Sequence, residues 1–330
     1  MERRDFLKRS TAAALALMGH GAVRATPSLA ADYPTNPIRV IVPYPAGGAA
    51  DVVARITAKY LSDQLGQQVF IDNRGGAGGT LGTDFAVRSA PDGYSLVWHT
   101  ISSAVLNKFL YTRVKLDVAE QFAPISQVGT AVQLLAINAK LPAQNLRELI
   151  VLLKTNPGKY HYGSNGLGGI MHLSGELFGF MAGTQVVHVP YRGEGAAMVD
   201  LIAGRIDMMV ASVPALLSHI RTDELRALCV NADHRLALLP DVPTAAEAGL
   251  PGYQTYNWHA LFAPLGTPEP IIKRLNEALI KAMDTPEVRK QLGEIGIEVV
   301  LSNPSSLSAE LKQQSDFWGP LIERSGVKLD

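Results

Sequence analysis

The sequence has little of three things that would narrow its function at once: cysteine, excess charge and long apolar runs. Its 330 residues include one cysteine, which excludes an intramolecular disulfide bond. Basic and acidic residues number 30 each, so the chain has no electrostatic footprint for a nucleic acid and no polybasic patch for a membrane. Cys229 lies in the apolar run 225–230, where we expect a buried thiol rather than a nucleophile.

The apolar run nearest the N-terminus is too short to span a membrane. It covers 13 residues, 11–23, whereas a membrane-spanning helix needs about 20. Small residues follow it at 28–30, and a basic segment precedes it with Arg3, Arg4, Lys8 and Arg9. That order is typical of a secretory signal peptide. We therefore predict a cleaved leader over residues 1–30, a mature N-terminus at Ala31 and a periplasmic protein.

The basic segment also suggests an export route. Its residues RRDFLK resemble the twin-arginine motif, although Glu2 stands where that motif prefers Ser or Thr. We expect export by this route, and a basic N-terminal tail that stays on the protein is the alternative. Loss of the leader would remove five basic and two acidic residues and leave a slightly acidic chain.

Short apolar runs alternate with amphipathic stretches along the mature chain. We predict strands over 38–42, 69–72 and 94–98, with helices over 51–65 and 80–90 between them. The pattern recurs from Gln133, with strands over 134–138, 160–163, 186–189, 207–211 and 225–230 and helices over 145–156, 169–182 and 195–204. Such βαβαβ patterns predict an α/β fold with mainly parallel sheets and helices on both faces.

About 300 mature residues exceed what one hydrophobic core usually supports, so we predict two lobes. Residues 31–130 with 252–330 would form the first, discontinuous lobe, and residues 131–251 the second. Three local signals mark helix or turn starts in the second half: Thr267-Pro268, Thr285-Pro286 and the capping box Thr244 to Glu247.

Four predicted strands end in Gly- and Ser-rich turns that lead into helices. These turns cover residues 43–51, 73–79, 163–169 and 190–195. Glycine lets a backbone approach a ligand closely, and a helix start offers unpaired N–H groups with partial positive charge. Because two turns lie in each half, we predict an anion site shared between the halves, beyond the carboxyl ends of the strands.

The usual catalytic motifs are missing. The chain has no G-x-S-x-G elbow and no phosphate-binding loop of the strict spacings. His172 and Glu176 share a helix face and could ligate a metal, but a hydrogen-bonded histidine near the helix start is the better interpretation. A serine hydrolase using Ser164 and His172 is a remote alternative.

Two further groups of residues carry weaker signals. Asp200 and Asp207 flank a helix-to-strand turn, where capping or solvated acids are more common than catalytic ones. An aromatic pocket wall and a packed junction are equally open interpretations of three aromatic residues, Tyr253, Tyr256 and Trp258. We therefore predict no catalytic residue, no metal and no cofactor.

The same loops resemble the Bug family, the solute-binding components of tripartite tricarboxylate transporters (TctC-like). The resemblance covers the mature chain, and its marks are YPTNPIRVIVPYPAGGAADVVAR, VFIDNRGGAGGTLG, APDGYSL, GSNGLGGIMHLSGELF, VHVPYRG, LRAL, LLPDVPTAAEAGLPGY and WHALFAPLGTP. It implies a two-lobed, Venus-flytrap (type II-like) periplasmic-binding-protein fold. It also implies a monomer that binds a carboxylate-bearing solute, with one or two acid groups or an aromatic ring, and delivers it to permease subunits of such a transporter. Some members of the family serve as sensors, which is the alternative function.

Position by position, the resemblance implies a set of solute contacts. In the first lobe they are Tyr44, Ala46, Gly47, Gly48, Asp51, Thr100 and Ser103, with His99 beside them. In the second lobe they are Ser164, Gly168, Gly169, His172, Tyr191, Arg192, Ala211 and Ser212.

This sequence departs from the family pattern near that site. His99 stands where the family usually has Gly, and Ile101 where a small residue is common. Gly169 replaces a frequent Ser, and Ala211 a frequent Asp. We therefore expect His99, Ile101 and Ala211 to influence which solute is chosen.

Overall fold

A computed structural model describes residues 33–111 and 113–329 of the chain. The predicted leader, its cleavage point and the twin-arginine motif lie outside the described residues. Contacts join the described residues from Pro34 onward into one unit. Within the described residues, no helix is long and apolar enough to cross a membrane.

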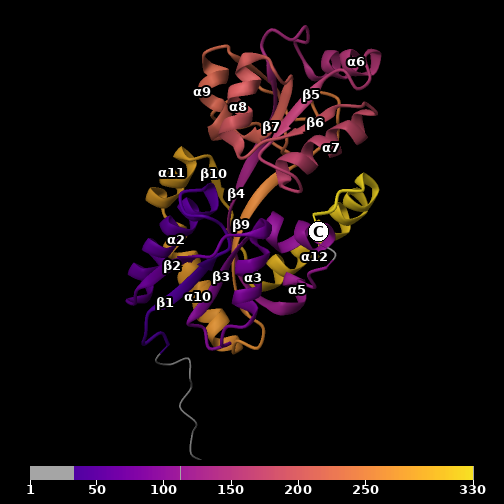
Figure 1. Ribbon diagram of the computed structural model, residues 1–330. Coiled ribbons are helices and arrows are strands. Elements are labelled where there is room, and N and C mark those ends of the chain that lie inside the picture. Colours follow the sequence, from indigo (N-terminus) through magenta and orange to yellow (C-terminus); the bar gives the residue numbers. More distant parts are fainter. Residues whose placement is uncertain (1–32, 112, 330) are drawn as a thin grey trace, which may run out of the picture. The chain divides into compact units, whose positions relative to one another are not determined.

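The first three strands form the parallel βαβαβ unit that the sequence predicts. β1 (Ile38–Val42) lies between β2 (Val69–Asn73) and β3 (Ser95–Thr100) and is parallel to both (Figure 1). Apolar β-branched residues fill β1, and four of its five residues are buried, which suits a strand covered on both faces. The connecting helices are α2 (Ala49–Leu65) and α3 (Thr80–Val87), the latter after a short turn of helix, η1 (Ala77–Gly79).

Two long strands link this unit to the second parallel group. β9 (Tyr256–Pro264) is antiparallel to both β3 and β4 (Phe122–Asn138), and β4 continues beside β7 (Met208–Ser212) and β8 (Leu225–Val230) (Figure 1). The prediction of a strand over 134–138 was too short. Pro124, Gly129 and two bulges interrupt the period-2 pattern of β4 before Gln133, so its first half carries no clear strand signal.

The second parallel group has the same strand arrangement as the first. β5 (His161–Ser164) lies between β6 (Val187–Pro190) and β7 and is parallel to both. The helices of this part are α6 (Leu146–Thr155), α7 (Ile170–Ala182), α8 (Glu194–Ala203) and α9 (Val213–Arg221). The fold is therefore α/β as predicted, with a curled sheet flanked by helices, and its parallel triplets are joined through antiparallel strands.

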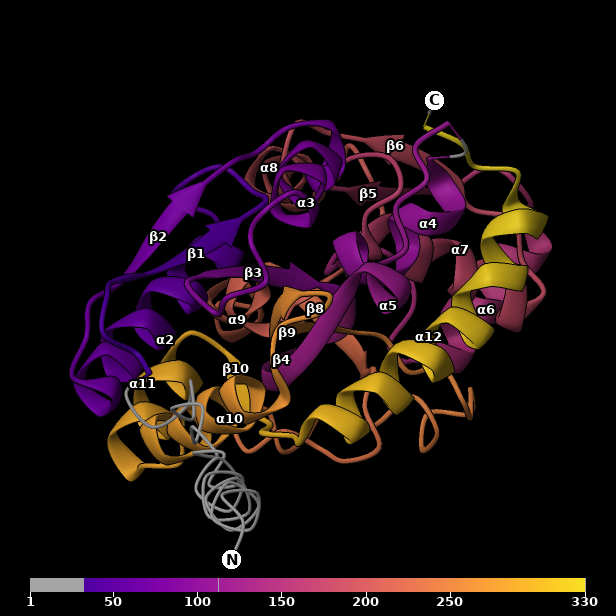
Figure 2. The ribbon, with the colours of Figure 1, turned by 90° about the horizontal axis from the view of Figure 1, so that it is seen from below.

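The remaining elements complete the part that begins with β1. Between β3 and β4 lie a π-helical turn η2 (Ser102–Leu106), α4 (Asn107–Leu110) and α5 (Val118–Gln121). After β9 come α10 (Glu269–Met283), α11 (Pro286–Glu294), β10 (Ile297–Val299) and α12 (Pro304–Ser325). Figure 2 shows α12 running beside α4 and α5, with which it is in contact.

The helix-start signals were right in two places and wrong in one. Thr285 caps α11 by accepting a bond from the N–H of Val288, and Thr244 and Glu247 form the two bonds of a capping box. Thr267 is not the cap of α10, because its hydroxyl donates to the carbonyl of Pro264 and the helix begins at Glu269 after Pro268. The local turn therefore competes successfully for this hydroxyl.

Two clusters of buried apolar side chains lie against the sheet. The larger includes Trp258, Trp318 and Tyr253, which are almost fully buried. Tyr253 and Trp258 thus pack in a junction rather than forming an open wall. Cys229 is fully buried as well, and burial raises the pKa of its thiol to about 12. The prediction of an inert, buried cysteine is confirmed.

Candidate functional site

The helices that follow the strands β1, β2, β5, β6 and β7 of the two parallel groups share one feature: they have no capping side chain. The helices α2, α3, α7, α8 and α9 follow N-cap residues Gly48, Gly79, Gly169, Gly193 and Ser212, none of which makes a side-chain cap bond. In contrast, α5, α6, α11 and α12 are capped by the side chains of Asp117, Asn145, Thr285 and Asn303. Among the other described helices, α4 and α10 follow Leu106 and Pro268, which have no side-chain acceptor. Uncapped N–H groups at strand ends are ready donors for an anion.

The loop 43–51 after β1 is shaped by the carboxylate of Asp51. This group accepts bonds from the N–H of Gly47 (2.8 Å), from Nδ2 of Asn73 (2.9 Å) and from Nε of Arg55 (2.9 Å). Burial alone would raise the pKa of Asp51, but the bonds from Arg55, Gly47 and Asn73 outweigh it and lower that pKa. All three bonds are internal, so Asp51 holds the loop in place, while Ala46, Gly47 and Gly48 are exposed.

A small hydroxyl network closes the end of β3 against this loop. The hydroxyls of Tyr44 and Thr100 lie 2.6 Å apart, and Ser103 bonds both the carbonyl and the N–H of Thr100. Burial raises the pKa of Tyr44, so its hydroxyl keeps its proton. The structure therefore brings together Tyr44, Thr100 and Ser103, and it does so through bonds within the protein.

His99 lies in the core behind this network. Its Nδ1 atom is 2.9 Å from Oγ of Ser103, and its ring meets Phe122 and Phe262 edge-on at 5.3 and 5.4 Å between centroids. Burial lowers its pKa to about 3, so the ring is neutral at physiological pH. His99 and its neighbour Ile101 are 0% and 1% exposed, so in this structure neither side chain lies at the surface of the predicted site.

At the end of β5, Ser164 is bonded to a histidine that the sequence analysis did not select. Its Oγ atom lies 2.7 Å from Nε2 of His188 and 2.9 Å from the carbonyl of Gly166. His188 lies on β6, and its ring stacks on those of His172 (3.9 Å) and Tyr162 (4.8 Å). Burial lowers the pKa of both histidines to about 4, and His172 lowers that of His188 further. His188 lies in the predicted strand 186–189 and in the family mark VHVPYRG, but neither signal singled it out as a site residue.

His172 is held as the sequence analysis expected. Its Nδ1 atom accepts a bond from the N–H of Gly168 at 3.0 Å, and its Nε2 atom lies 3.8 Å from Oε1 of Glu176. Among residues 33–111 and 113–329, no group of three or more potential ligands could hold a metal ion. His172 therefore fixes the loop before α7, while Gly169 stays partly exposed at the helix start.

The loop after β6 presents charge of both signs. Tyr191 donates its hydroxyl to Asp200 at 2.7 Å, and Arg205 holds the other oxygen of that carboxylate. Arg192, the next residue, is exposed and forms no ion pair with any described residue. Asp207 accepts a bond from the N–H of His161. The two acids Asp200 and Asp207 thus have structural partners, as expected, while the guanidinium of Arg192 is available to a ligand.

At the end of β7, Ser212 lies next to Glu194, with Oγ 3.4 Å from Oε1 of the glutamate, and Ala211 precedes it in the strand. Ala211 is fully buried, and Ser212 is half-buried at the N-cap of α9.

Three cavities lie away from all the predicted contacts. One of about 400 Å³ is bounded by α11 and β10, one of about 290 Å³ lies beside Tyr256 and Glu310, and another of about 290 Å³ lies between α7 and α12. The predicted contacts fall into two groups, which we call the first and second walls of the candidate site. The first wall comprises residues 44–51 with 99–103, and the second residues 164–172 with 191–192 and 211–212. His188 and Glu194 adjoin the second wall.

Comparisons with known proteins show what the chain as a whole is similar to. A family model described as "Tripartite tricarboxylate transporter family receptor" matches residues 53–327. Protein BugT of Bordetella pertussis is 37% identical over 306 residues, 92% of this chain and 94% of BugT. A Rhodopseudomonas palustris protein solved with adipate superimposes with a TM-score of 0.79, at 32% identity over 89% of this chain and 99% of that one. MatC from the same organism, solved with bound malate, gives 0.75 at 30% identity over 88% and 100%.

Proposed function

We propose that this chain, which belongs to the tripartite tricarboxylate transporter receptor family, captures a small carboxylate-bearing organic anion and delivers it to a membrane permease. The family and the fold are those of solute-binding proteins, and structural relatives are periplasmic. Relatives solved with adipate and malate support a carboxylate ligand for this chain. The observation that carries the proposal is the set of uncapped helix starts at the strand ends, with Arg192 unpaired beside them.

The hydrogen-bond donors of the candidate site match the acceptors of a carboxylate. A helix start without a capping side chain leaves N–H groups that need an acceptor, and its dipole favours a negative charge. A solute carboxylate would supply four lone-pair sites for these donors and for the guanidinium of Arg192. Asp51 and His172 would keep the first and second walls preorganised, so that little conformational entropy is lost on binding.

The site would work by closure of two lobes. We propose that residues 31–130 with 252–330 form one lobe and residues 131–251 the other, so that the walls lie on different lobes. The strands β4 and β9 cross between them, which supports a hinge at these strands. Export as a cleaved precursor, by the twin-arginine route, would place the protein where its relatives act.

No reaction on the solute is proposed. A serine hydrolase would need a histidine beside Ser164 that can accept its proton, together with an exposed hydroxyl. The nearest histidine is His188, yet Ser164 is 0% exposed and its hydroxyl is also within bonding distance of the carbonyl of Gly166. Turnover of carboxylate esters by the purified protein, lost in His188→Ala, would contradict this part of the proposal.

A thermal-shift screen tests the proposal. The purified protein would be heated with monocarboxylates, dicarboxylates and aromatic acids, and with sugars and amines as controls. An acid at 100 times its dissociation constant should stabilise the protein by about 2.7 kcal/mol, which is a clear melting shift. A shift with sugars or amines and with no acid would overturn the proposal. Uptake of the identified acid, lost on gene deletion, would distinguish delivery to a permease from sensing.

A further inference from the structure

Glu194 is the first residue of α8 and lies next to the predicted contacts without being one of them. Its side chain is half-buried, and Oε1 lies 3.4 Å from Oγ of Ser212, which also offers its backbone N–H. No lysine, arginine or histidine among the described residues lies within ion-pair distance of it. A carboxylate that is withdrawn from water without a cation costs free energy, so its position calls for an explanation.

The position of Glu194 is that of a residue in the solute site. β5 lies between β6 and β7, so the bond from Ser212 at the end of β7 to Glu194 after β6 reaches across the strand that ends at Ser164. Arg192 lies two residues earlier on the same loop. Because Arg192 and Glu194 do not pair with each other, one loop offers the site a cation and an anion at once.

We propose that Glu194 is a specificity-determining residue, whose carboxylate accepts a hydrogen bond from a hydroxyl or amino group of the bound acid and disfavours a second carboxylate there. The inference rests on the proposed function. A carboxylate is acceptor-only when ionised, so a donor on the solute would satisfy it and an ionised group would be repelled. Arg192 would take the solute's own carboxylate, and Glu194 would select the other end.

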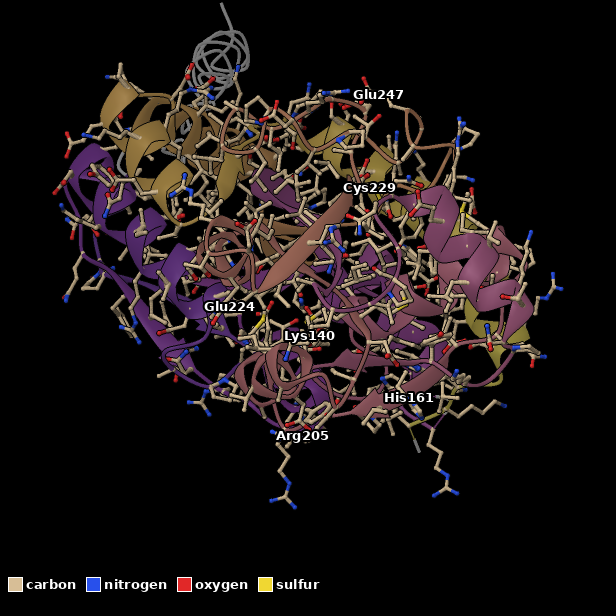
Figure 3. The ribbon with its side chains drawn as sticks, turned by 90° about the horizontal axis from the view of Figure 1, so that it is seen from above. Lys140, His161, Arg205, Glu224, Cys229 and Glu247 are labelled. Carbon is tan, nitrogen blue, oxygen red and sulfur yellow. The ribbon has the colours of Figure 1, made fainter. Side chains whose placement is uncertain are left out.

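A purely structural role for Glu194 is the alternative to a role in specificity. Glu194 could serve only to satisfy the N–H groups at the start of α9, as Glu247 does for Thr244. That role would affect melting temperature and leave the ranking of solutes unchanged. Glu247, labelled in Figure 3, therefore supplies a matched control, since its replacement also removes a capping carboxylate.

The experiment compares matched six-carbon probes by calorimetry: hexanoate, 6-hydroxyhexanoate, 6-aminohexanoate and hexanedioate, together with their four-carbon counterparts. We expect the wild-type protein to prefer a hydroxy or amino acid over the diacid of equal length by about tenfold or more. In Glu194→Gln the diacid should gain and this preference should shrink to about threefold or less. Glu194→Asp, which keeps the charge, should keep the direction of the preference, and Glu247→Gln should leave the ranking unchanged.

The outcomes distinguish a failure of the proposed role of Glu194 from a failure of the proposed function. Acids that bind the wild type and Glu194→Gln with the same ranking would overturn the role of Glu194 and leave the proposed function standing. Binding of no acid to the wild-type protein would overturn both. If Glu194→Gln unfolds, Glu194→Asp decides: loss of the preference in that folded variant also counts against the proposal.

Discussion

The two walls of the candidate site are built from the same local pattern, a strand end followed by a glycine-rich loop and a helix, yet they use their side chains differently. In the first wall, Asp51, Tyr44 and Thr100 are bonded to other parts of the protein. In and beside the second wall, Arg192 and Glu194 keep charges that have no partner of opposite sign within the described chain. Under the proposed function, the first wall would offer mainly a fixed backbone, while the second would supply the charged groups that recognise the solute.

The largest expected effect is on the pH dependence of stability. It tests a feature that both walls share, because each contains at least one buried, neutral histidine. Burial lowers the pKa of His99 to about 3 and the pKa values of His172 and His188 to about 4. Since an unfolded histidine has a pKa near 6.5, the unfolded chain takes up protons first as pH falls. Stability is therefore complete above pH about 6.5 and falls below it by about 1.4 kcal/mol per pH unit for each histidine, until the folded pKa is reached.

Urea unfolding at pH 8, 6 and 5 measures this effect. The variant His99→Gln should show a slope that is shallower by roughly one histidine's share, about 1.4 kcal/mol per pH unit. A free energy of unfolding that stays constant between pH 7 and 5 would show that these rings are not buried as described.

The second effect breaks the first wall alone. Asp51→Ala removes an acceptor from Gly47, Asn73 and Arg55, and hydrogen bonds to a charged group contribute about 1.5–3 kcal/mol each. We expect a loss of about 3 kcal/mol in the free energy of unfolding, less than the simple sum, because Arg55 is exposed to water and bonds to one carboxylate are not additive. Binding of the acid should weaken as well. Asp84→Ala, which removes only an exposed pair with Arg88, should cost less than about 1 kcal/mol. Equal losses in the two variants would remove Asp51 from its structural role.

The third effect breaks the second wall without unfolding it. Arg192→Ala should weaken binding of the acid by roughly 10- to 100-fold, because a charge-assisted bond is lost, while the melting temperature stays nearly unchanged. Arg205→Ala is the matched control, since Arg205 is an exposed arginine of the same part and is already paired with Asp200 (Figure 3). Calorimetry that shows the same affinity for both variants would argue that Arg192 does not contact the solute.

The smallest effects compare one hydroxyl from each wall. Tyr44→Phe removes a bond to Thr100 and should cost about 1 kcal/mol of stability, with affinity changed by less than about threefold. Ser164→Ala should weaken binding by about 1–2 kcal/mol if this hydroxyl reaches the anion on closure. An unchanged affinity in Ser164→Ala would remove Ser164 from the site and leave it as the partner of His188.

The sequence predicted most of what repeats locally and little of what depends on distant partners. The strands β1, β2 and β5 and the helices α2, α6 and α7 follow from periodic apolar residues and glycine-rich turns. The first half of β4 was missed because Pro124 and Gly129 interrupt it. The strand β9 was not predicted either, although Pro251-Gly252 and Gly266 flank it. Thr267 carried a cap signal, but a carbonyl three residues earlier took its hydroxyl.

The sequence predicted the loops of the candidate site better than the bonds between its residues. Tyr44, Thr100 and Ser103 do meet, and Ser164 and His172 both contact His188. The bond from Ser164 to His188 and the approach of Ser212 to Glu194 depend on the order of β5, β6 and β7 in the sheet, which a single sequence does not specify. Burial of His99 likewise depends on packing against Phe122 and Phe262.

The most direct measurement is a crystal structure of the protein with the acid that the thermal screen identifies. We expect one carboxylate of that acid to lie within hydrogen-bond distance of backbone N–H groups at the starts of α2 and α7, with the guanidinium of Arg192 beside it. An acid bound instead in the cavity between α7 and α12, with the loops 43–51 and 163–169 free of ligand, would contradict the account.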